Sequence, residues 1–205
     1  MRADRQTGGR GRSGRVWLSA AGNLYASGLV LLQPGDPSAP GLALVAGVAV
    51  EETVRAYLGD AAPGLLLKWP NDLLYAGAKL AGILLEREGD VVAVGIGVNL
   101  AHHPDLSDRP ATDIATICGA APEPGQFLHD LALAFARWLG RWRMEGLGPV
   151  RARWLERAHP AGTALHANGT TGLFDGLDES GALRLRLADG TVHVIQAGDV
   201  FLVQD

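Results

Sequence analysis

The chain has 205 residues, of which 47% are hydrophobic and 20% charged, and its formal net charge at pH 7 is −4. This length suits one sizeable domain, or one domain with a small appendage, and the composition excludes a chain that is disordered throughout. The negative charge argues against a general nucleic-acid coat and against binding to an anionic membrane surface. Cys118 is the only cysteine, which rules out an internal disulfide, and no apolar run reaches the ~18 residues of a membrane span. With no signal-peptide pattern at the N-terminus, the sequence predicts a soluble, cytoplasmic protein.

The first half of the chain predicts a strand, a helix and a meander of strands. Residues 24–33 are apolar enough for a strand, which a stretch rich in proline and glycine then ends. Apolar residues recur at three-and-four spacing through 41–58, the pattern of an amphipathic helix. Three short apolar segments follow at 65–69, 79–86 and 91–100, separated by turn residues. They predict buried strands that follow one another directly.

The second half predicts one further helix and then a small β domain. Between residues 126 and 144, large apolar side chains line one helical face. From Thr163 onward, short alternating segments are separated by the turn signals GLDESG and ADGT, a pattern typical of hairpins. Residues 145–162 are predicted to join the two parts. The sequence therefore predicts an α+β fold, with a mixed or antiparallel sheet flanked by helices and a small C-terminal β-barrel.

A stretch rich in glycine and arginine, QTGGRGRSGRVW at residues 6–17, contains almost no apolar residue to bury. Glycine-rich backbone can turn its N–H groups toward an anion, and arginine side chains supply forked donors for carboxylate and phosphate. The stretch is therefore either a solvated basic tail or a loop that folds around an anionic ligand. Its own residues leave both interpretations open.

The segment KWPND, residues 68–72, places Lys68 at the end of a predicted buried strand. A lysine is costly to bury unless an anion meets it, so Lys68 indicates an anion-binding site. A solvated lysine beside a turn, with Trp69 in the core, is the alternative. The segment GIGVN, residues 95–99, ends another predicted strand with glycines that would let a ligand approach the backbone. It lacks the third glycine and the following helix of a dinucleotide-binding motif, and its own residues favour plain strand packing.

The remaining polar residues indicate no further chemistry. The six histidines do not have the spacing of a metal site, and Cys118 lies in the apolar stretch ICGA, where burial is expected. No serine nucleophile flanked by glycines is present, so the residues do not point to covalent catalysis.

In combination and in this order, ADRQTGGRGRSGRVW, KWPNDLLYAGAKLAGILLE and VGIGVNL resemble the catalytic domain of bacterial biotin protein ligases. The resemblance runs from about Ala3 to the C-terminus, because the small terminal β domain also matches that family. It implies a biotin/lipoate ligase-like catalytic domain at residues 1–158 and an SH3-like β-barrel at residues 159–205.

The resemblance implies that the protein activates biotin with ATP and Mg²⁺ to biotinyl-5′-AMP and transfers biotin to one lysine of a biotin carboxyl carrier protein. Lys68 matches the lysine that contacts the biotin carboxylate and the adenylate phosphate, and Trp17 matches the aromatic residue near the adenine. The arginine–glycine loop matches the segment that closes over the substrates, which makes Arg10 a second catalytic candidate. The substrate-binding candidates are Gln6, Gly9, Arg10, Gly11, Arg12, Trp17, Lys68, Asn71, Lys79, Gly82, Gly97 and Asn99.

The chemistry of this reaction agrees with these candidates. Attack of a carboxylate on the α-phosphate brings two anions together, so fixed cations such as Lys68, Arg10 and Arg12, with Mg²⁺ carried by ATP, would lower the barrier. The mixed anhydride that forms is readily hydrolysed, so a loop that closes over it has a purpose. We therefore expect residues 6–17 to be a lid that is mobile without ligand. No metal site made of protein groups alone is predicted.

The sequence departs from the family pattern at its N-terminus. Family members carry an earlier Ser/Thr–Thr–Asn segment that holds the ureido ring of biotin, and this chain begins after it, so the catalytic domain is predicted to be N-terminally incomplete. Three functions remain open: a working ligase, a non-catalytic or truncated protein that binds biotin or its adenylate, and a lipoate or octanoate ligase or transferase of the same fold. The chain lacks the DNA-binding domain of repressor-type relatives, which predicts no DNA partner. Both a monomer and a homodimer are compatible with the sequence.

Overall fold

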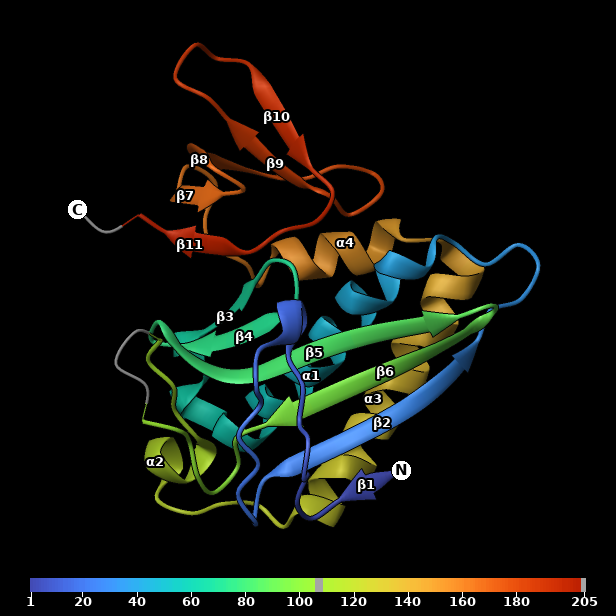
Figure 1. Cartoon of the computed structure of the whole chain (residues 1–205), viewed down its shortest axis with the longest axis vertical. Coiled ribbons are helices and arrows are strands. Elements are labelled where there is room, and N and C mark those ends of the chain that lie inside the picture. Colours follow the sequence, from blue (N-terminus) through green and yellow to red (C-terminus); the bar gives the residue numbers. More distant parts are fainter. Residues whose placement is uncertain (106–108, 204–205) are drawn as a thin grey trace.

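The computed structural model describes residues 1–105 and 109–203. It contains a larger and a smaller β-sheet and several α-helices (Figure 1). The strands are β1 (Arg2–Ala3), β2 (Leu24–Leu31), β3 (Leu65–Lys68), β4 (Asp72–Tyr75), β5 (Ala78–Glu88), β6 (Val91–Val98), β7 (Ala164–Ala167), β8 (Thr170–Leu177), β9 (Leu183–Arg186), β10 (Val192–Ile195) and β11 (Val200–Leu202). The α-helices are α1 (Leu42–Leu58), α2 (Ile114–Cys118), α3 (Pro124–Glu145) and α4 (Gly148–Leu155).

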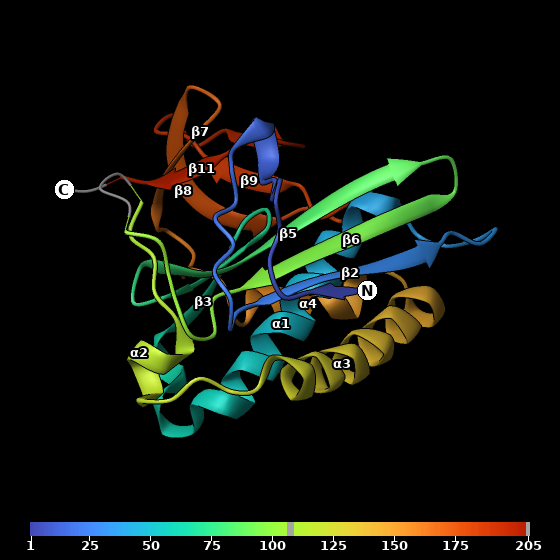
Figure 2. The ribbon, with the colours of Figure 1, turned by 60° about the horizontal axis from the view of Figure 1, so that its bottom comes forward.

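The larger sheet has the strand order β1-β2-β6-β5-β4-β3, and all its neighbouring strands are antiparallel. β5 and β6 form its long central hairpin, in which Ile83 pairs with Ile96 and Gly82 with Gly97. Because side chains alternate across a strand, the two isoleucines point to one face and the two glycines lie on the other. Helices α1 and α3 cover the first face, whereas the arginine–glycine loop lies over the second (Figure 2).

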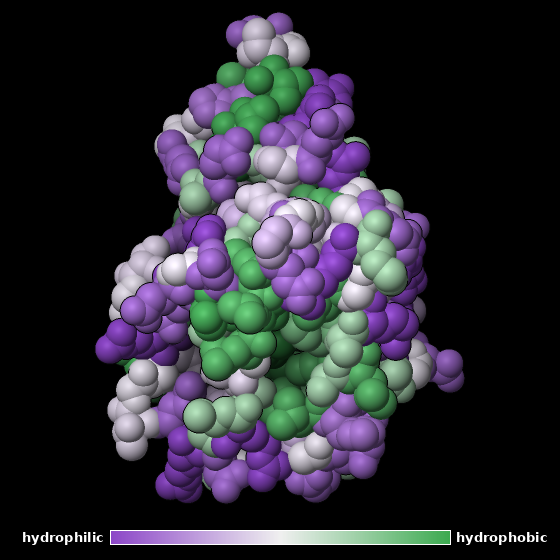
Figure 3. All heavy atoms as spheres, turned by 90° about the vertical axis from the view of Figure 1, so that its right-hand side faces the viewer, coloured by the Kyte–Doolittle hydropathy of each residue, from purple (hydrophilic) through white to green (hydrophobic). Residues whose placement is uncertain are grey.

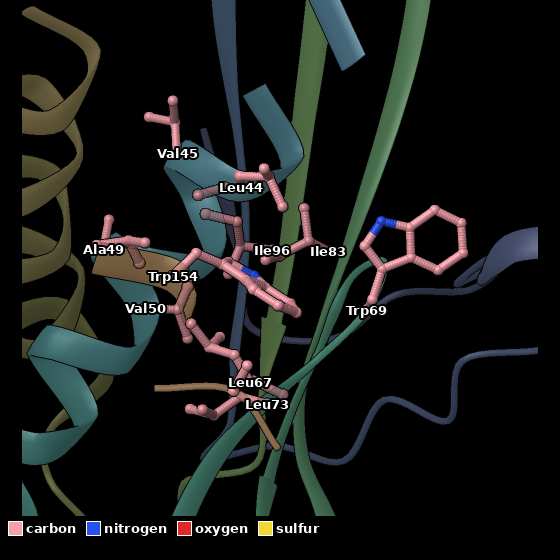
Figure 4. Packing of buried hydrophobic residues seen from close by; sticks show 14 of the residues in the cluster. Leu44, Val45, Ala49, Val50, Leu67, Trp69, Leu73, Ile83, Ile96 and Trp154 are labelled. Carbon is pink, nitrogen blue, oxygen red and sulfur yellow. The ribbon is translucent and has the colours of Figure 1, made fainter. Parts of the chain in front are cut away.

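Helix α1 lies at the centre of the core because almost every turn of it is buried. Val45 and Ala49 face the cluster that contains Ile83 and Ile96 of the sheet, and Trp154 of α4 packs beside them (Figure 4). Burying an aliphatic side chain of this size stabilises a fold by about 1.5–3 kcal/mol. This apolar layer therefore gives the glycine face of the sheet a rigid support.

The smaller sheet has the strand order β10-β9-β8-β7-β11. Within the described residues its end strands, β10 and β11, do not pair with each other. The predicted β-barrel is therefore a β domain whose sheet is not closed by hydrogen bonds. The segment that leads into it runs beside β3, where Leu67 N donates to Arg157 O at 2.7 Å. Trp69, a buried member of the core cluster (Figure 4), donates its indole N–H to Gly181 O at 3.0 Å. Phe201 of β11 lies near the end of β3, with its ring centre 5.7 Å from Lys68 Nζ.

The predicted α+β fold is confirmed, and the helix predictions differ from the structure by only a few residues. α3 begins at Pro124 rather than at 126 because the Glu123 side chain accepts hydrogen bonds from the first free N–H groups of the helix. α1 ends at Leu58 because the next residue, Gly59, has a φ of 52°, a positive value that glycine adopts readily.

Four elements, β1, β4, α2 and α4, were not predicted from the sequence, and one burial was predicted wrongly. The meander contains four strands rather than three, because β4 follows the Pro70–Asn71 turn directly. Leu73 and Leu74 are both buried, so β4 lacks an alternating pattern, and the irregularity opposite them lies in β5, where Leu80 is passed over. The joining segment contains α4, which begins beside a proline that starts rather than breaks a helix. Cys118 is exposed, because α2 buries Ile114 instead. None of the helices in the described ranges combines the length and the apolar character that crossing a bilayer demands.

Candidate active site

A cavity of about 1000 Å³ lies between the glycine face of the larger sheet, the arginine–glycine loop and β11 of the smaller sheet. This volume is at the upper end of typical small-molecule sites, which span ~300–1,000 Å³. Its walls come from residues 6–18, from the turn at 68–72, from β5 and β6, and from residues 199–202. The cavity is therefore assembled by the tertiary fold and not by one contiguous motif.

Two lysines enter the cavity from strands on either side of β4. Lys68 ends β3 and Lys79 stands near the start of β5. Asp72 of β4 pairs with Lys68 in strand register, but its carboxylate lies 2.5 Å from Lys79 Nζ. Burial lowers the pKa of Lys68, and the charges of Asp72 and Asp199 partly offset that effect. Within the described residues Lys68 makes no ion pair, so its charge is available to an anionic ligand.

Trp17 lies flat on the glycine pair at the centre of the sheet. A Cβ atom on Gly97 would stand 2.7 Å from Trp17 Cζ2, and one on Gly82 would stand 3.0 Å from Trp17 Cζ3, so any larger residue would displace the indole. The ammonium group of Lys79 lies 5.4 Å from the centre of the indole ring. The indole N–H is buried and has no hydrogen-bond partner among the described residues. The ring is therefore a ready platform for a planar group with an acceptor atom.

The arginine–glycine loop is tethered to the smaller sheet. Arg12 Nη1 donates to Gly198 O at 3.0 Å, and Arg15 Nη2 donates to Asp199 Oδ1 at 2.8 Å. Inside the loop, Gly11 N donates to Arg15 O at 2.7 Å. The loop is therefore folded against the cavity and held by residues near the C-terminus. Its mobility without ligand stays a prediction.

Comparison with known proteins decides the family. The profile of the Biotin/lipoate A/B protein ligase family matches residues 2–101, and that of the Biotin protein ligase C terminal domain matches residues 165–203. The biotin--[acetyl-CoA-carboxylase] ligase of Paracoccus denitrificans is 42% identical over 97% of this chain and 88% of its own length. The chain belongs to the biotin protein ligase family.

Two further relatives are consistent with this assignment. The structure of the biotin protein ligase of Aquifex aeolicus in complex with biotin and ATP superposes with a TM-score of 0.86, at 28% identity over 100% of this chain and 88% of that one. The bifunctional ligase/repressor BirA of Bacillus subtilis is 32% identical over 95% of this chain, which spans 63% of that protein.

In this ligase, eleven of the twelve substrate-binding candidates line the cavity, namely Gln6, Arg10, Gly11, Arg12, Trp17, Lys68, Asn71, Lys79, Gly82, Gly97 and Asn99. Gly9 does not line the cavity. It is part of the loop, and its carbonyl accepts a hydrogen bond from Trp17 N at 2.9 Å. A Cβ atom there would stand 2.5 Å from Trp17 O, so only glycine lets the two backbone segments meet. Gly9 therefore shapes the loop of the ligase and is not part of the cavity wall.

The two candidate asparagines, Asn71 and Asn99, donate their amide N–H groups to backbone carbonyls. Asn71 Nδ2 donates to Ile83 O at 2.7 Å, which fastens the KWPND turn to β5. Asn99 is buried, and its Nδ2 donates to Thr112 O at 3.0 Å. Their side chains thus hold the cavity wall in shape, whereas both were predicted from the sequence as substrate-binding candidates.

Sequence reasoning missed three residues that this site of the ligase contains. Asp72 stands inside the KWPND motif, so the motif could have pointed to it as a partner for a lysine. Asp199 and Phe201 also line the cavity, and Phe201 places its ring centre 5.7 Å from Lys68 Nζ. Nothing local marks Asp199, which lies 184 residues from the arginine that it binds. The described residues contain no cluster of three or more histidine, cysteine or acidic side chains that could hold a metal ion.

Proposed function

We propose that this protein activates biotin with MgATP to biotinyl-5′-AMP and pyrophosphate, and then transfers biotin to a lysine of the biotin carboxyl carrier protein of a carboxylase. The observation that carries the proposal is the cavity itself. It gathers two lysines and the arginine–glycine loop over a flat floor of glycines, in a chain whose relatives are named biotin--[acetyl-CoA-carboxylase] ligases.

In the first step a carboxylate oxygen of biotin forms a bond to the α-phosphorus of ATP, and pyrophosphate leaves. Lys68 is the cation that meets the two anions, because within the described residues it lines the cavity without making an ion pair. Arg10 and Arg12 add positive charge from the loop. Magnesium enters as part of the substrate MgATP, bound by its phosphates.

In the second step the amine of the carrier lysine attacks the acyl carbon of the mixed anhydride, and AMP leaves. Water competes for the same carbon, so the loop must stay closed until the carrier arrives. The tether to Gly198 and Asp199 supplies that closure. We also propose that the two domains divide between residues 158 and 159, just after the contact of Ala158 with β3.

We further propose that this protein is cytoplasmic, has no DNA partner and forms a homodimer through the edge of the larger sheet. β1 pairs with β2 only at Tyr25 and Ala26, which leaves the rest of β2 at the sheet edge. Leu29 is 76% exposed and Leu31 62% exposed there. The face of the molecule seen in Figure 3 carries hydrophobic side chains gathered around a hollow. Light scattering after size exclusion, with Leu29→Asp as the dimer-breaking variant, would test this.

The decisive experiment is the intact mass of a biotin carrier domain after incubation with this protein, biotin and MgATP. A gain of one biotin that requires ATP supports the proposal. Parallel incubations with lipoate and octanoate test the other acids that the family profile covers. No gain with any acid, in the presence of folded protein, would favour a binding protein without turnover.

Gly97→Ala should lower the rate of adenylate formation by about tenfold, the effect of ~1.4 kcal/mol on the barrier. The added methyl group would stand 2.7 Å from the indole of Trp17 and push it into the cavity. Gly28→Ala is the matched control, because Gly28 lies on β2 of the same sheet outside the cavity lining and its methyl group would meet no atom within 4 Å. Pyrophosphate release measures both, and equal rates for the two variants would show that the indole position is irrelevant.

Asp199→Asn should let the adenylate escape faster by about fivefold, because an ion pair near the surface is worth at most ~1 kcal/mol. The variant keeps the shape of the side chain but removes the charge that holds Arg15. Asp189→Asn is the control, since Asp189 only caps Thr191 in the same sheet. The measurement is free biotinyl-5′-AMP in the filtrate after one turnover; the same retention in both variants would mean that the tether does not close the loop.

A further inference from the structure

Amines are scarce in this protein. Lysine occurs only at positions 68 and 79, and the other 16 of its 18 basic residues are arginines, which stay protonated and do not act as nucleophiles. Both lysines line the cavity. The α-amino group of Met1 is the remaining amine, and it donates to Ser27 O at 2.9 Å. An acyl-adenylate made in the cavity therefore meets two lysines at the site and none on the outer surface.

Lys79 is protected against acylation by its contacts. Its Nζ lies 2.5 Å from Asp72 Oδ1, so attack on an acyl carbon would first require this ion pair to break. The same Nζ lies 5.4 Å from the centre of the Trp17 ring, and that contact would be lost as well.

Lys68 lacks this protection. It makes no ion pair within the described part of the chain, and Phe201 is the aromatic ring that its Nζ approaches, at 5.7 Å. Burial lowers its pKa, which increases the fraction of neutral amine at a given pH. It also stands at the cavity wall where the proposed function places the acyl phosphate.

We propose that Lys68 is the residue at which this protein is acylated by its own biotinyl-5′-AMP when no carrier is present, and that Lys79 is spared. This inference rests on the proposed function, because the adenylate must form in this cavity.

The reaction needs no further reactant. The Lys68 ammonium loses one proton to solvent, and the neutral nitrogen attacks the acyl carbon of the mixed anhydride. A C–N amide bond forms, the bond from the acyl carbon to the phosphate oxygen breaks, and AMP leaves with that electron pair; the second proton leaves the nitrogen. The product is a neutral amide. Acylation therefore removes the available cation and makes idle turnover self-limiting.

The first test measures amine reactivity without any enzymatic step. The protein is treated with a limiting amount of acetyl N-hydroxysuccinimide ester, digested, and analysed by mass spectrometry. Lys68 should be acetylated about fivefold faster than Lys79, because Lys79 must first break its ion pair with Asp72. Asp72→Asn should bring the two rates together by releasing Lys79, whereas Asp90→Asn, at the β5–β6 turn, should leave their ratio unchanged. Equal rates in the parent protein would overturn the protection of Lys79.

The second test uses synthetic biotinyl-5′-AMP, and in parallel biotin with MgATP, both without carrier. Biotin should be found on Lys68 and not on Lys79 or Met1, and its rate of attachment should rise about tenfold per pH unit below the pKa of Lys68. Biotin on another amine, or none on Lys68 after prolonged exposure to the synthetic adenylate, would overturn the proposal. Label from the synthetic adenylate without pyrophosphate release from MgATP would instead support the proposal while overturning the proposed function.

Discussion

Lys68→Ala is expected to lower the rate of biotinyl-5′-AMP formation by about 100- to 1,000-fold, the loss seen when one fixed charge-stabilising group is removed from a site. Within the described residues Lys68 is the cavity lysine that makes no ion pair, so its charge is directed at the ligand and not at a carboxylate of the protein. The fold should persist, because the side chain lies at the end of β3 and not in the core. The measurement is pyrophosphate release under saturating biotin and MgATP.

Two variants separate this effect from a general loss of charge or shape. Lys68→Met keeps the length of the side chain and should be as inactive as Lys68→Ala. Arg87→Ala removes a cation from the far end of β5, where its Nε only meets Gly89 O, and should keep the parent rate. Thermal unfolding of all three checks the fold. Adenylate formation by Lys68→Met at the parent rate would remove Lys68 from the mechanism.

Lys79→Ala is expected to be at least as damaging, by about 1,000-fold, because it has two effects. The site loses one cation, and the carboxylate of Asp72, freed from its 2.5 Å contact, becomes an uncompensated negative charge beside the place where two anions must meet. The rate of pyrophosphate release should therefore fall further than the loss of one hydrogen-bond donor would explain.

The double variant Lys79→Ala with Asp72→Asn tests the second effect. Removing the freed carboxylate should recover about tenfold of the lost rate, whereas two independent losses would make the double variant slower than either single one. A double variant slower than Lys79→Ala would show that Asp72 contributes to the reaction in its own right. Asp72→Asn alone should retain more activity than Lys79→Ala.

Much of the fold could be predicted because it depends on local patterns. The periodic apolar residues of 41–58 and 126–144 mark α1 and α3, and the apolar runs mark the central strands of the larger sheet. β4 and α4 escaped prediction for a local reason. β4 has only four residues, of which the adjacent Leu73 and Leu74 are both buried, and α4 has too few apolar residues to show a helical period.

The sequence by itself indicated which segments line the cavity. QTGGRGRSGRVW and KWPND combine residue types that are costly to bury or to order without an anion, so they point to a site before any fold is known. The two-lysine composition of the chain, and with it the short list of amines that an acyl-adenylate can meet, is likewise a property of the sequence alone.

Only the tertiary structure decided which of these residues meet. Asp72 neutralises Lys79 rather than its strand partner Lys68, because the reach of the two side chains, and not the register, sets the contact. Asp199 holds Arg15 across 184 residues, and Trp17 rests on two glycines from different strands. Pairing between distant segments depends on how the sheets pack, and neighbouring residues carry no signal of it.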